Sequence, residues 1–264
     1  MQKKEPGAHS SPRIAGFFAA LLASCLLFLA GVPAHAWDLL GYKNVVGSGH
    51  ASSEKRELTP FHQIAVDLPC KVELIQGASE AVLIAADDNL LPLIETVVKN
   101  GQLTIKPAKG VNLSSRSSIQ LTVHARTVDG LSLAGSADLL AARLQSPKLS
   151  TSIAGSGSMT IKELQSDALS VSIAGSGRFE AQGTAAVMDV SIAGSGDVKA
   201  PRLSVQDVGV NIAGSGDATV WARKALSVSI VGSGDVRYYG DATRSDTSTL
   251  GSGRVKQLGI SPPV

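Results

Sequence analysis

Three aspartates recur at nearly constant spacing in the C-terminal part of the chain, and they form the pattern most able to do chemistry. Asp197, Asp217 and Asp235 each follow a Gly-Ser-Gly triplet, and Arg178 and Arg254 occupy the same position in flanking repeats. If the repeats stack, carboxylates about 5 Å apart repel by roughly 1–3 kcal/mol at surface-like dielectric. Calcium, which accepts several oxygen ligands in flexible geometry, would relieve that repulsion. The spacing predicts a weak calcium site; the alternative is that each aspartate caps a turn and is solvated separately.

Small polar side chains recur in the same repeats as two files. The first file is Ser152, Ser172, Ser191, Asn211 and Ser229. The second file is Ser156, Ser176, Ser195, Ser215 and Ser233. Stacked about 4.8 Å apart, they would form a flat polar surface able to bind a glycan, an envelope polymer or another protein. The alternative is that small residues suit a crowded, exposed sheet face without binding anything.

Catalytic motifs do not accompany these files. The chain has no H-E-x-x-H or G-x-S-x-G motif, and His50, His62 and His124 lack metal-ligand spacing. The Gly-Ser-Gly triplet is not followed by the Lys-Ser/Thr of a phosphate loop. Asp87 and Asp88 stand at a strand end and are interpreted as turn formers rather than as a catalytic pair. We therefore predict no enzyme activity and no cofactor apart from weakly bound calcium.

The element that must position these residues is a repeat of about 20 residues. The first glycine of the triplet recurs as Gly135, Gly155, Gly175, Gly194, Gly214, Gly232 and Gly251. A fixed period of this length is typical of a solenoid, in which one short supersecondary unit stacks on the next. The repeat therefore predicts the architecture of the C-terminal half.

Each repeat reads as a strand followed by a corner. Residues 169–174 alternate apolar and small polar side chains, as a half-buried strand does. Aligned by the glycine, the repeats form apolar columns, of which the most uniform is Ile153, Ile173, Ile192, Ile212 and Ile230. Stacked parallel strands would point this column inward, and Gly-Ser-Gly suits a corner because glycine accepts positive φ. The pattern predicts a parallel β-helix with about 19–20 residues per coil.

The other parts of the chain are expected to be less regular. Residues 50–128 predict a β-rich N-terminal half, with a hairpin at Asn100-Gly101 and a polar loop over residues 110–118. Residues 37–49 form a polar lead-in, residues 129–258 the solenoid and residues 259–264 a tail. In the last coil Ser245, Thr247 and Thr249 replace the apolar column residues, as expected for the polar end of a stack.

Residues 1–36 have the pattern of a secretory signal peptide. Basic residues precede an apolar run over 14–32, and Ala34-His35-Ala36 predicts cleavage before Trp37. The alternatives are an uncleaved membrane anchor and a lipoprotein signal, because residues 22–25 resemble a lipobox with Cys25 as the lipidated residue. The chain is thus predicted to be exported, periplasmic or extracellular, or lipid-anchored through Cys25. After cleavage it would not be an integral membrane protein.

Removing the predicted signal changes the charge balance. The signal holds three of the 24 basic residues and one of the 22 acidic ones, which leaves 21 of each. A neutral mature chain gives no indication of a nucleic-acid partner. Cys70 would be the single remaining cysteine, interpreted as a buried small hydrophobe rather than a nucleophile.

Two sets of residues resemble a known family. One set is Phe61-x-x-Ile64-x-Val66 leading to Gly77, and the other is the repeated Gly-Ser-Gly-Asp corner, as in residues 194–197. Together they resemble the putative auto-transporter adhesin, head GIN domain family of exported bacterial proteins, over roughly residues 45–256. The resemblance implies a right-handed parallel β-helix and export, and it brings no catalytic residues.

The sequence favours an exported, non-enzymatic β-helix that acts as an adhesin-like surface binding module in the bacterial cell envelope. Its alternatives are a polysaccharide-active β-helix enzyme, a lyase or a hydrolase, and a structural envelope scaffold. The short coils, uniform corners and scarcity of aromatic residues, 4% of the chain, favour binding over catalysis. The oligomeric state is not predicted.

Overall fold

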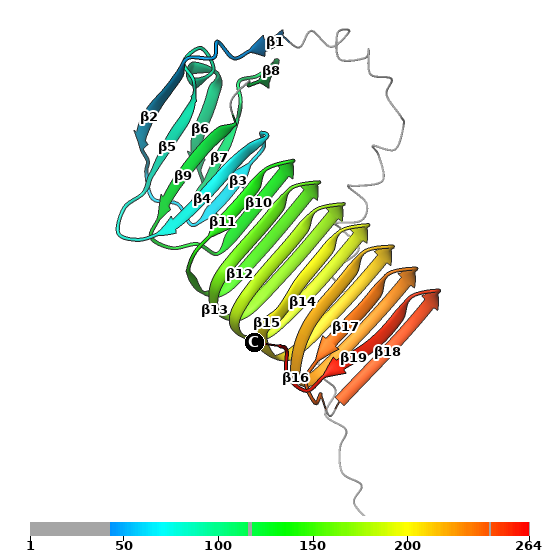
Figure 1. Cartoon of the computed structure of the whole chain (residues 1–264). Helices are drawn as coiled ribbons and strands as arrows, with labels where there is room; N and C mark the ends of the chain where they lie inside the picture. The colour runs from blue at the N-terminus through cyan, green and yellow to red at the C-terminus, as the bar shows by residue number, and fades with distance from the viewer. Residues whose placement is uncertain (1–42, 116–117, 243, 264) are drawn as a thin grey trace, which may run out of the picture. The chain divides into compact units, whose positions relative to one another are not determined.

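The computed structural model describes residues 43–115, 118–242 and 244–263. Nearly all of these residues lie in β-strands (Figure 1), which confirms the all-β prediction. The 3-10 helix η1 (Leu91–Leu93) is the sole helical element among them. The described part therefore contains no helix of the length and apolarity that crossing a membrane requires. The predicted signal peptide, Cys25 and Trp37 lie outside the described residues.

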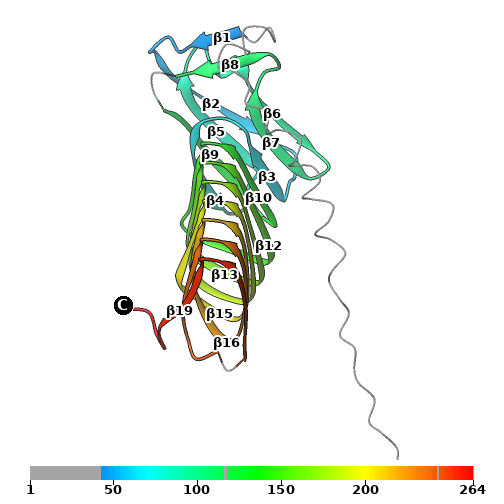
Figure 2. The ribbon, with the colours of Figure 1, turned by 90° about the vertical axis from the view of Figure 1, so that its right-hand side faces the viewer.

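The C-terminal part is the predicted solenoid (Figures 1 and 2). Its strands are β10 (Gly130–Gly135), β11 (Asp138–Ala141), β12 (Leu144–Gly155), β13 (Ser158–Gly175), β14 (Arg178–Gly194), β15 (Asp197–Gly214), β16 (Asp217–Gly232), β17 (Asp235–Tyr239), β18 (Arg244–Gly251) and β19 (Arg254–Gly259). Every pairing between them is parallel and joins equivalent positions of successive coils. The predicted column Ile153–Ile173–Ile192–Ile212–Ile230 is in register and buried. The parallel β-helix is thus confirmed.

Strands β13, β14 and β15 each bend twice, so that their coils have three sides. In β15 the buried positions are Val198 and Ala200 on the first side, Leu203 and Val205 on the second, and Val208, Val210 and Ile212 on the third. Two adjacent residues that are not buried interrupt the alternation at each bend, which turns the backbone while keeping apolar side chains inside. The first side follows the Gly-Ser-Gly corner, and the third side leads into the next corner.

The corner requires glycine because successive corners touch. Gly194 has φ 123°, and a Cβ there would lie 2.6 Å from the carbonyl oxygen of Gly175 in the coil before. A Cβ on Gly196 would lie 2.5 Å from Cγ2 of Ile173. Between these glycines, Ser195 donates its backbone N–H to Gly175 O at 2.8 Å. Close stacking of the corners, together with positive φ at the first position, therefore requires glycine at both ends of the triplet.

The N-terminal strands extend the solenoid and then close it. They are β1 (Lys43–Val46), β2 (Ala51–Glu57), β3 (Gln63–Val66), β4 (Cys70–Gln76), β5 (Ala81–Asp87), β6 (Ile94–Lys99), β7 (Gln102–Pro107), β8 (Val111–Ser114) and β9 (Ile119–Ala125). Strands β3 and β4 pair in parallel with β10 and β11, and β7 and β9 form the next layer. Strands β5 and β2 then add antiparallel pairings. The irregular half is thus continuous with the β-helix.

Two local features of this region differ in how well the sequence predicted them. The Asn100-Gly101 hairpin is confirmed: β6 and β7 are antiparallel, and Asn100 and Gly101 have φ of 52° and 76°. Strand β8, by contrast, lies within the 110–118 segment that the sequence indicated as a polar loop. It pairs in parallel with β1 in a separate two-stranded sheet. This pairing joins segments far apart in the chain, so local composition does not reveal it.

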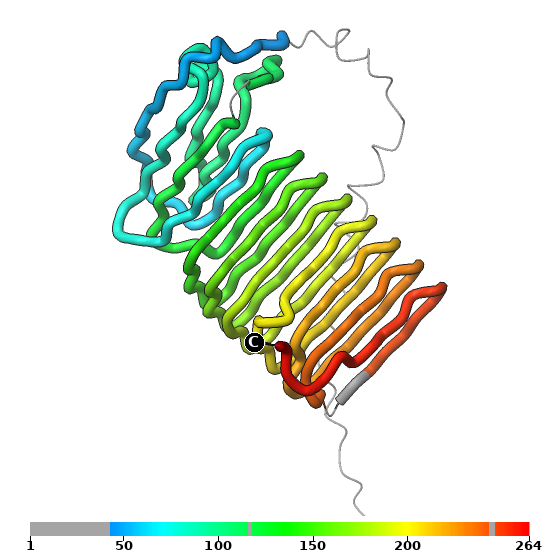
Figure 3. The backbone as a smooth tube through the Cα atoms, viewed as in Figure 1, coloured from blue at the N-terminus to red at the C-terminus, as the bar shows by residue number. Residues whose placement is uncertain are grey.

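At the other end, the last coil is polar as predicted. Thr247 and Thr249 stand in register with Val228 and Ile230, and Ser245 with Leu226. The chain then turns back (Figure 3), and Pro262 and Pro263 come to lie near the outer face of the first side. The stack therefore ends in a polar coil followed by a returning tail.

Candidate functional site

The predicted serine files lie on the outside of the solenoid, and we call them together the serine face. Ser152, Ser172, Ser191, Asn211 and Ser229 are in register on the third side, between inward-facing column residues. The corner serines are exposed, and each donates its backbone N–H to the glycine of the preceding corner. The geometry on which the sequence prediction depended is present, while binding by these residues stays a prediction.

The outward positions beside the serines are also small. Ala154, Ala174, Ala193 and Ala213 form the file nearest the corner, and this file ends in Val231 and Leu250. Asp189 interrupts the small residues: it lies beside Gly209, where a Cβ would be 2.8 Å from its Oδ1. Partial burial raises the pKa of the Asp189 carboxyl. The third side thus presents a flat surface of hydroxyl and methyl groups.

The predicted aspartate ladder forms at the start of the first side. Asp197 and Asp217 are register partners, and the backbone N–H of Asp235 donates to Asp217 Oδ1 at 2.8 Å. The ladder runs on to Arg254, whose backbone N–H donates to Asp235 Oδ1 at 3.2 Å. The carboxylates of Asp217 and Asp235 therefore each accept a hydrogen bond from the backbone of the next corner, as aspartates commonly do in turns.

Three arginines balance the three carboxylates. Arg178 contacts Asp197 at 3.6 Å, and Arg254 contacts Asp235 at 3.0 Å. Arg237, which sequence reasoning did not single out, lies 3.6 Å from Asp217 and 3.3 Å from Asp235. The hydrogen bond from Arg254 is the main reason that the pKa of Asp235 lies below its ordinary value.

These ion pairs bear on the calcium hypothesis. Arg178 and Arg254 at the two ends of the ladder offset the repulsion between its carboxylates without a metal ion. Among the described residues, no group of three or more acidic, His or Cys side chains is arranged to hold a metal ion. Calcium binding to Asp197, Asp217 and Asp235 stays a prediction, with the arginines as its competitors.

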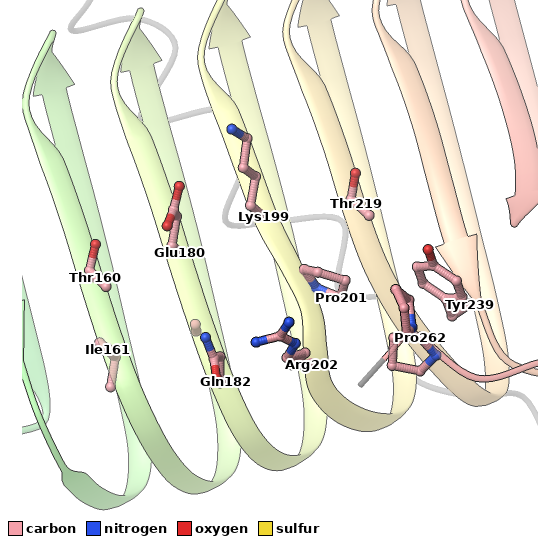
Figure 4. Close-up of a pocket in the computed structure, with 12 residues that line it drawn as sticks. Thr160, Ile161, Glu180, Gln182, Lys199, Pro201, Arg202, Thr219, Tyr239 and Pro262 are labelled. Atoms are coloured by element: carbon pink, nitrogen blue, oxygen red, sulfur yellow. The ribbon is translucent and has the colours of Figure 1, made fainter.

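A groove that the sequence did not predict lies farther along the first side. It has a volume of about 310 Å³ and crosses the outer faces of β13–β16, with Pro262 and Pro263 as part of its wall. Figure 4 shows Glu180, Lys199 and Arg202 along it, with Tyr239 and Pro262 toward β17. The groove therefore brings charged groups and the ring of Tyr239 together on the outer face of the coils.

A difference in coil length produces this groove. The register between β14 and β15 shifts between Glu180 and Gln182, so Pro201 is an extra residue at a bulge. A larger shift follows Lys199 in the pairing of β15 with β16. Bulges tolerate proline and redirect neighbouring side chains, here Arg202. The sequence signal was the step of 18 residues between Gly214 and Gly232, beside steps of 19 or 20.

Cys70, Asp87 and Asp88 differ in their burial and in their hydrogen bonds. Cys70 is buried and unpaired, and burial, followed by the charge of Asp138, raises the pKa of its thiol to about 12. A thiol with this pKa is a poor nucleophile, in agreement with the prediction. Asp88 accepts a hydrogen bond from the hydroxyl of Ser48, which lowers the pKa of its carboxyl. Asp87 is buried, and its Oδ2 accepts from Ser115 Oγ at 2.9 Å.

Comparison with protein families matches residues 60–242 to the family described as putative auto-transporter adhesin, head GIN domain. The match includes both β4, with its Phe61–Gly77 surroundings, and most of the Gly-Ser-Gly corners. Comparison with curated proteins gives no match.

Several solved structures have a similar fold. A putative adhesin from Bacteroides fragilis is 24% identical with a TM-score of 0.75, over 81% of this chain and 100% of that one. A putative lipid binding protein from Parabacteroides distasonis is 26% identical with a TM-score of 0.68, over 82% and 100%. A putative adhesin from Parabacteroides merdae is 24% identical with a TM-score of 0.66, over 81% and 99%. These similarities establish the fold.

Proposed function

The chain belongs to the putative auto-transporter adhesin, head GIN domain family, and we propose that it is an exported, non-enzymatic binding module of the bacterial cell envelope. Its similarity to proteins described as putative adhesins supports an adhesin-like role. The module would act through the outer surface of the solenoid, because the inner positions of the coils are filled by apolar side chains.

The observation that carries this proposal is the serine face. Its side chains repeat at the spacing of strands in a sheet, about 4.8 Å, and they are held by the parallel register of β12–β16. A hydroxyl both donates and accepts hydrogen bonds, so such a face suits a partner with repeated polar groups, such as a glycan or an envelope polymer. Short side chains also lose little rotamer entropy when a ligand covers them.

Binding suits the groove on the first side better than glycoside hydrolysis does. Glycosidases commonly use two carboxylates on opposite sides of the scissile bond. Among the described residues that line the groove, Glu180 supplies the single carboxylate. The nearest ladder carboxylates, Asp197 and Asp217, are engaged with Arg178 and Arg237. The hydrolase alternative therefore lacks a second carboxylate among the described residues that line the groove.

Export is the part of the proposal that depends on the sequence. The signal-peptide pattern predicts a mature N-terminus at Trp37, in the periplasm or outside the cell. Mass spectrometry of the protein isolated from its host decides between the alternatives. An N-terminal, lipid-modified Cys25 would indicate a lipid-anchored protein. Detection of residues 1–36 on the isolated protein would contradict cleavage.

Binding is tested with a glycan array that includes envelope polymers, beside a polysaccharide-degradation assay. Ser172→Arg combined with Asn211→Arg places two long charged side chains on the serine face, and we expect binding to weaken at least about tenfold. Gln165→Arg is the matched control, because Gln165 is exposed on the second side. Equal weakening by the control, or degradation of a polymer by the wild type, would contradict a non-enzymatic binding face.

A further inference from the structure

The groove on the first side differs in charge from the ladder beside it. In the ladder, three arginines face three carboxylates. In the groove, Lys199 and Arg202 are exposed, and no carboxylate of the described residues forms an ion pair with either of them. Glu180 is the register partner of Lys199 and offsets one positive charge. Counted over the described residues that line it, the groove carries one net positive charge, which an anionic ligand would match.

Tyr239 is the aromatic side chain among the described residues that line this groove. Tyr239 is half-buried at an outward position, whereas its register partner Trp221 pairs with Ser204 of the second side and does not line the groove. Phe61 and Phe179, by comparison, are inside the core. Aromatic rings half-exposed in a concave site offer a flat apolar surface for a ligand, with polar groups beside them to orient it. Thr160, Thr219 and Gln182 supply hydroxyl and amide groups along the groove.

We propose that this groove binds an acidic saccharide, with a sugar ring against Tyr239 and its carboxylate held by Lys199 and Arg202. The inference rests on the proposed binding function and adds a site and a ligand class to it. Arg202 is suited to a carboxylate because its guanidinium can donate two parallel hydrogen bonds. Sugar hydroxyls would bond to Thr160, Thr219 and Gln182.

The position of the groove favours a saccharide over an acidic peptide. Extended peptides gain affinity by pairing their backbone with a free sheet edge. This groove lies across the face of the first side, where the strands of β13–β16 already pair with the coils above and below. Recognition here must therefore come from side chains, which suits a ligand that presents hydroxyl and carboxylate groups all around its rings.

The test measures binding of oligogalacturonate to the mature chain by calorimetry, with the fully methyl-esterified oligomer as the matched neutral ligand. We expect the acidic oligomer to bind, the ester to bind at least about tenfold more weakly, and affinity to fall with added salt. Arg202→Ala, Lys199→Ala and Tyr239→Ala should each weaken binding about tenfold. Arg202→Lys should retain part of it. Arg223→Ala is the control, because Arg223 is an exposed arginine on β16 outside the groove.

Melting curves confirm that each variant is folded before its binding is compared. Equal affinity for acid and ester, no effect of the groove variants, or binding of a Glu-rich peptide in place of the saccharide would overturn the inference. If serine-face variants abolish binding while groove variants do not, the proposed function stands and the acidic-saccharide site falls. If the wild type binds nothing on the glycan array or in calorimetry, both fall.

Discussion

In the coils from β12 to β16 every strand pairs in parallel with the same position of the next coil, whereas three pairings between β2 and β9 are antiparallel. The coils are joined by backbone hydrogen bonds and glycine corners. The N-terminal strands depend more on single side chains, such as Arg56, which donates to Ile94 O at 2.6 Å and to Leu91 O at 3.0 Å. Repetition therefore stabilises one region, and individual contacts stabilise the other.

The difference also concerns how the two ends of the stack are closed. At the N-terminal end, β5 and β2 cover the last parallel strand, β9, by antiparallel pairing. At the C-terminal end, β18 and β19 keep one unpaired edge each among the described residues, and Thr247, Thr249 and Lys256 are exposed there. Polar and lysine-bearing edges disfavour uncontrolled strand addition. One end of this stack is thus protected by additional strands, and the other by polar residues at its exposed edge.

The largest expected effect is in the coils. Ile192→Asp places an unpaired charge in the isoleucine column between Ile173 and Ile212, and we expect it to lower the free energy of unfolding by roughly 4 kcal/mol or more. Circular dichroism and a melting curve measure the loss. Ser191→Asp on the same strand is the control and should change stability little. An unchanged melting temperature for Ile192→Asp would contradict its inward position.

Corner glycines should be next in effect. Gly214 has φ 133°, and a Cβ there would lie 2.2 Å from the carbonyl oxygen of Gly194. Gly214→Ala should cost about 2–4 kcal/mol because strain and a backbone clash add. Gly77→Ala in the N-terminal region is the matched control, since nothing lies within 4 Å of its added Cβ. Denaturant unfolding of both variants compares them, and equal losses would mean that the stacked corners are not the constraint.

In the N-terminal region, Asn89 should have a local effect. Its side chain accepts from Ser48 N at 2.9 Å and donates to Val46 O at 2.9 Å. Asn89→Ala should cost about 1–2 kcal/mol and speed hydrogen exchange over residues 43–50 while the coils stay protected. Asn211→Ala on the serine face is the control. Faster exchange in β12–β16 would show that the two regions do not respond separately.

A smaller effect is expected from Asp189 on the serine face. Partial burial raises the pKa of its carboxyl, so the folded state holds the proton more tightly than the unfolded state does. The contribution of Asp189 to stability is then lost as pH rises through the raised pKa. Asp189→Asn should raise the melting temperature at pH 7 by less than about 2 °C, and the difference should vanish near pH 3. A variant that melts below the wild type at pH 7 would contradict this.

The smallest expected effect concerns calcium at the ladder. If calcium bridges Asp197, Asp217 and Asp235, millimolar calcium raises the melting temperature of the wild type, and Asp217→Asn weakens that response. If the arginines and turn chemistry suffice, the wild type melts at the same temperature in calcium and in chelator. Equal melting temperatures would exclude the site and leave the ladder as ion-paired corners.

The sequence by itself determined the repeated part of the molecule. Period, apolar columns and glycine corners all describe contacts between residues one coil apart, so the positions of Ile192, Gly194 and the aspartate ladder follow from alignment alone. The polar last coil follows for the same reason. The hairpin at Asn100-Gly101 was also predictable, because positive φ at two adjacent residues is a local requirement.

Tertiary structure alone decided the parts that break the repeat. The groove needs the bulge at Pro201, the shorter coil of β16 and a tail that turns back onto the first side. Strand β8 forms because β1 lies beside it, and Arg237 joins the ladder because its long side chain reaches two coils. Each of these depends on which distant segment fills a given space. The reach of a side chain and the contacts between distant segments leave no regular spacing in the sequence, whereas backbone periodicity does.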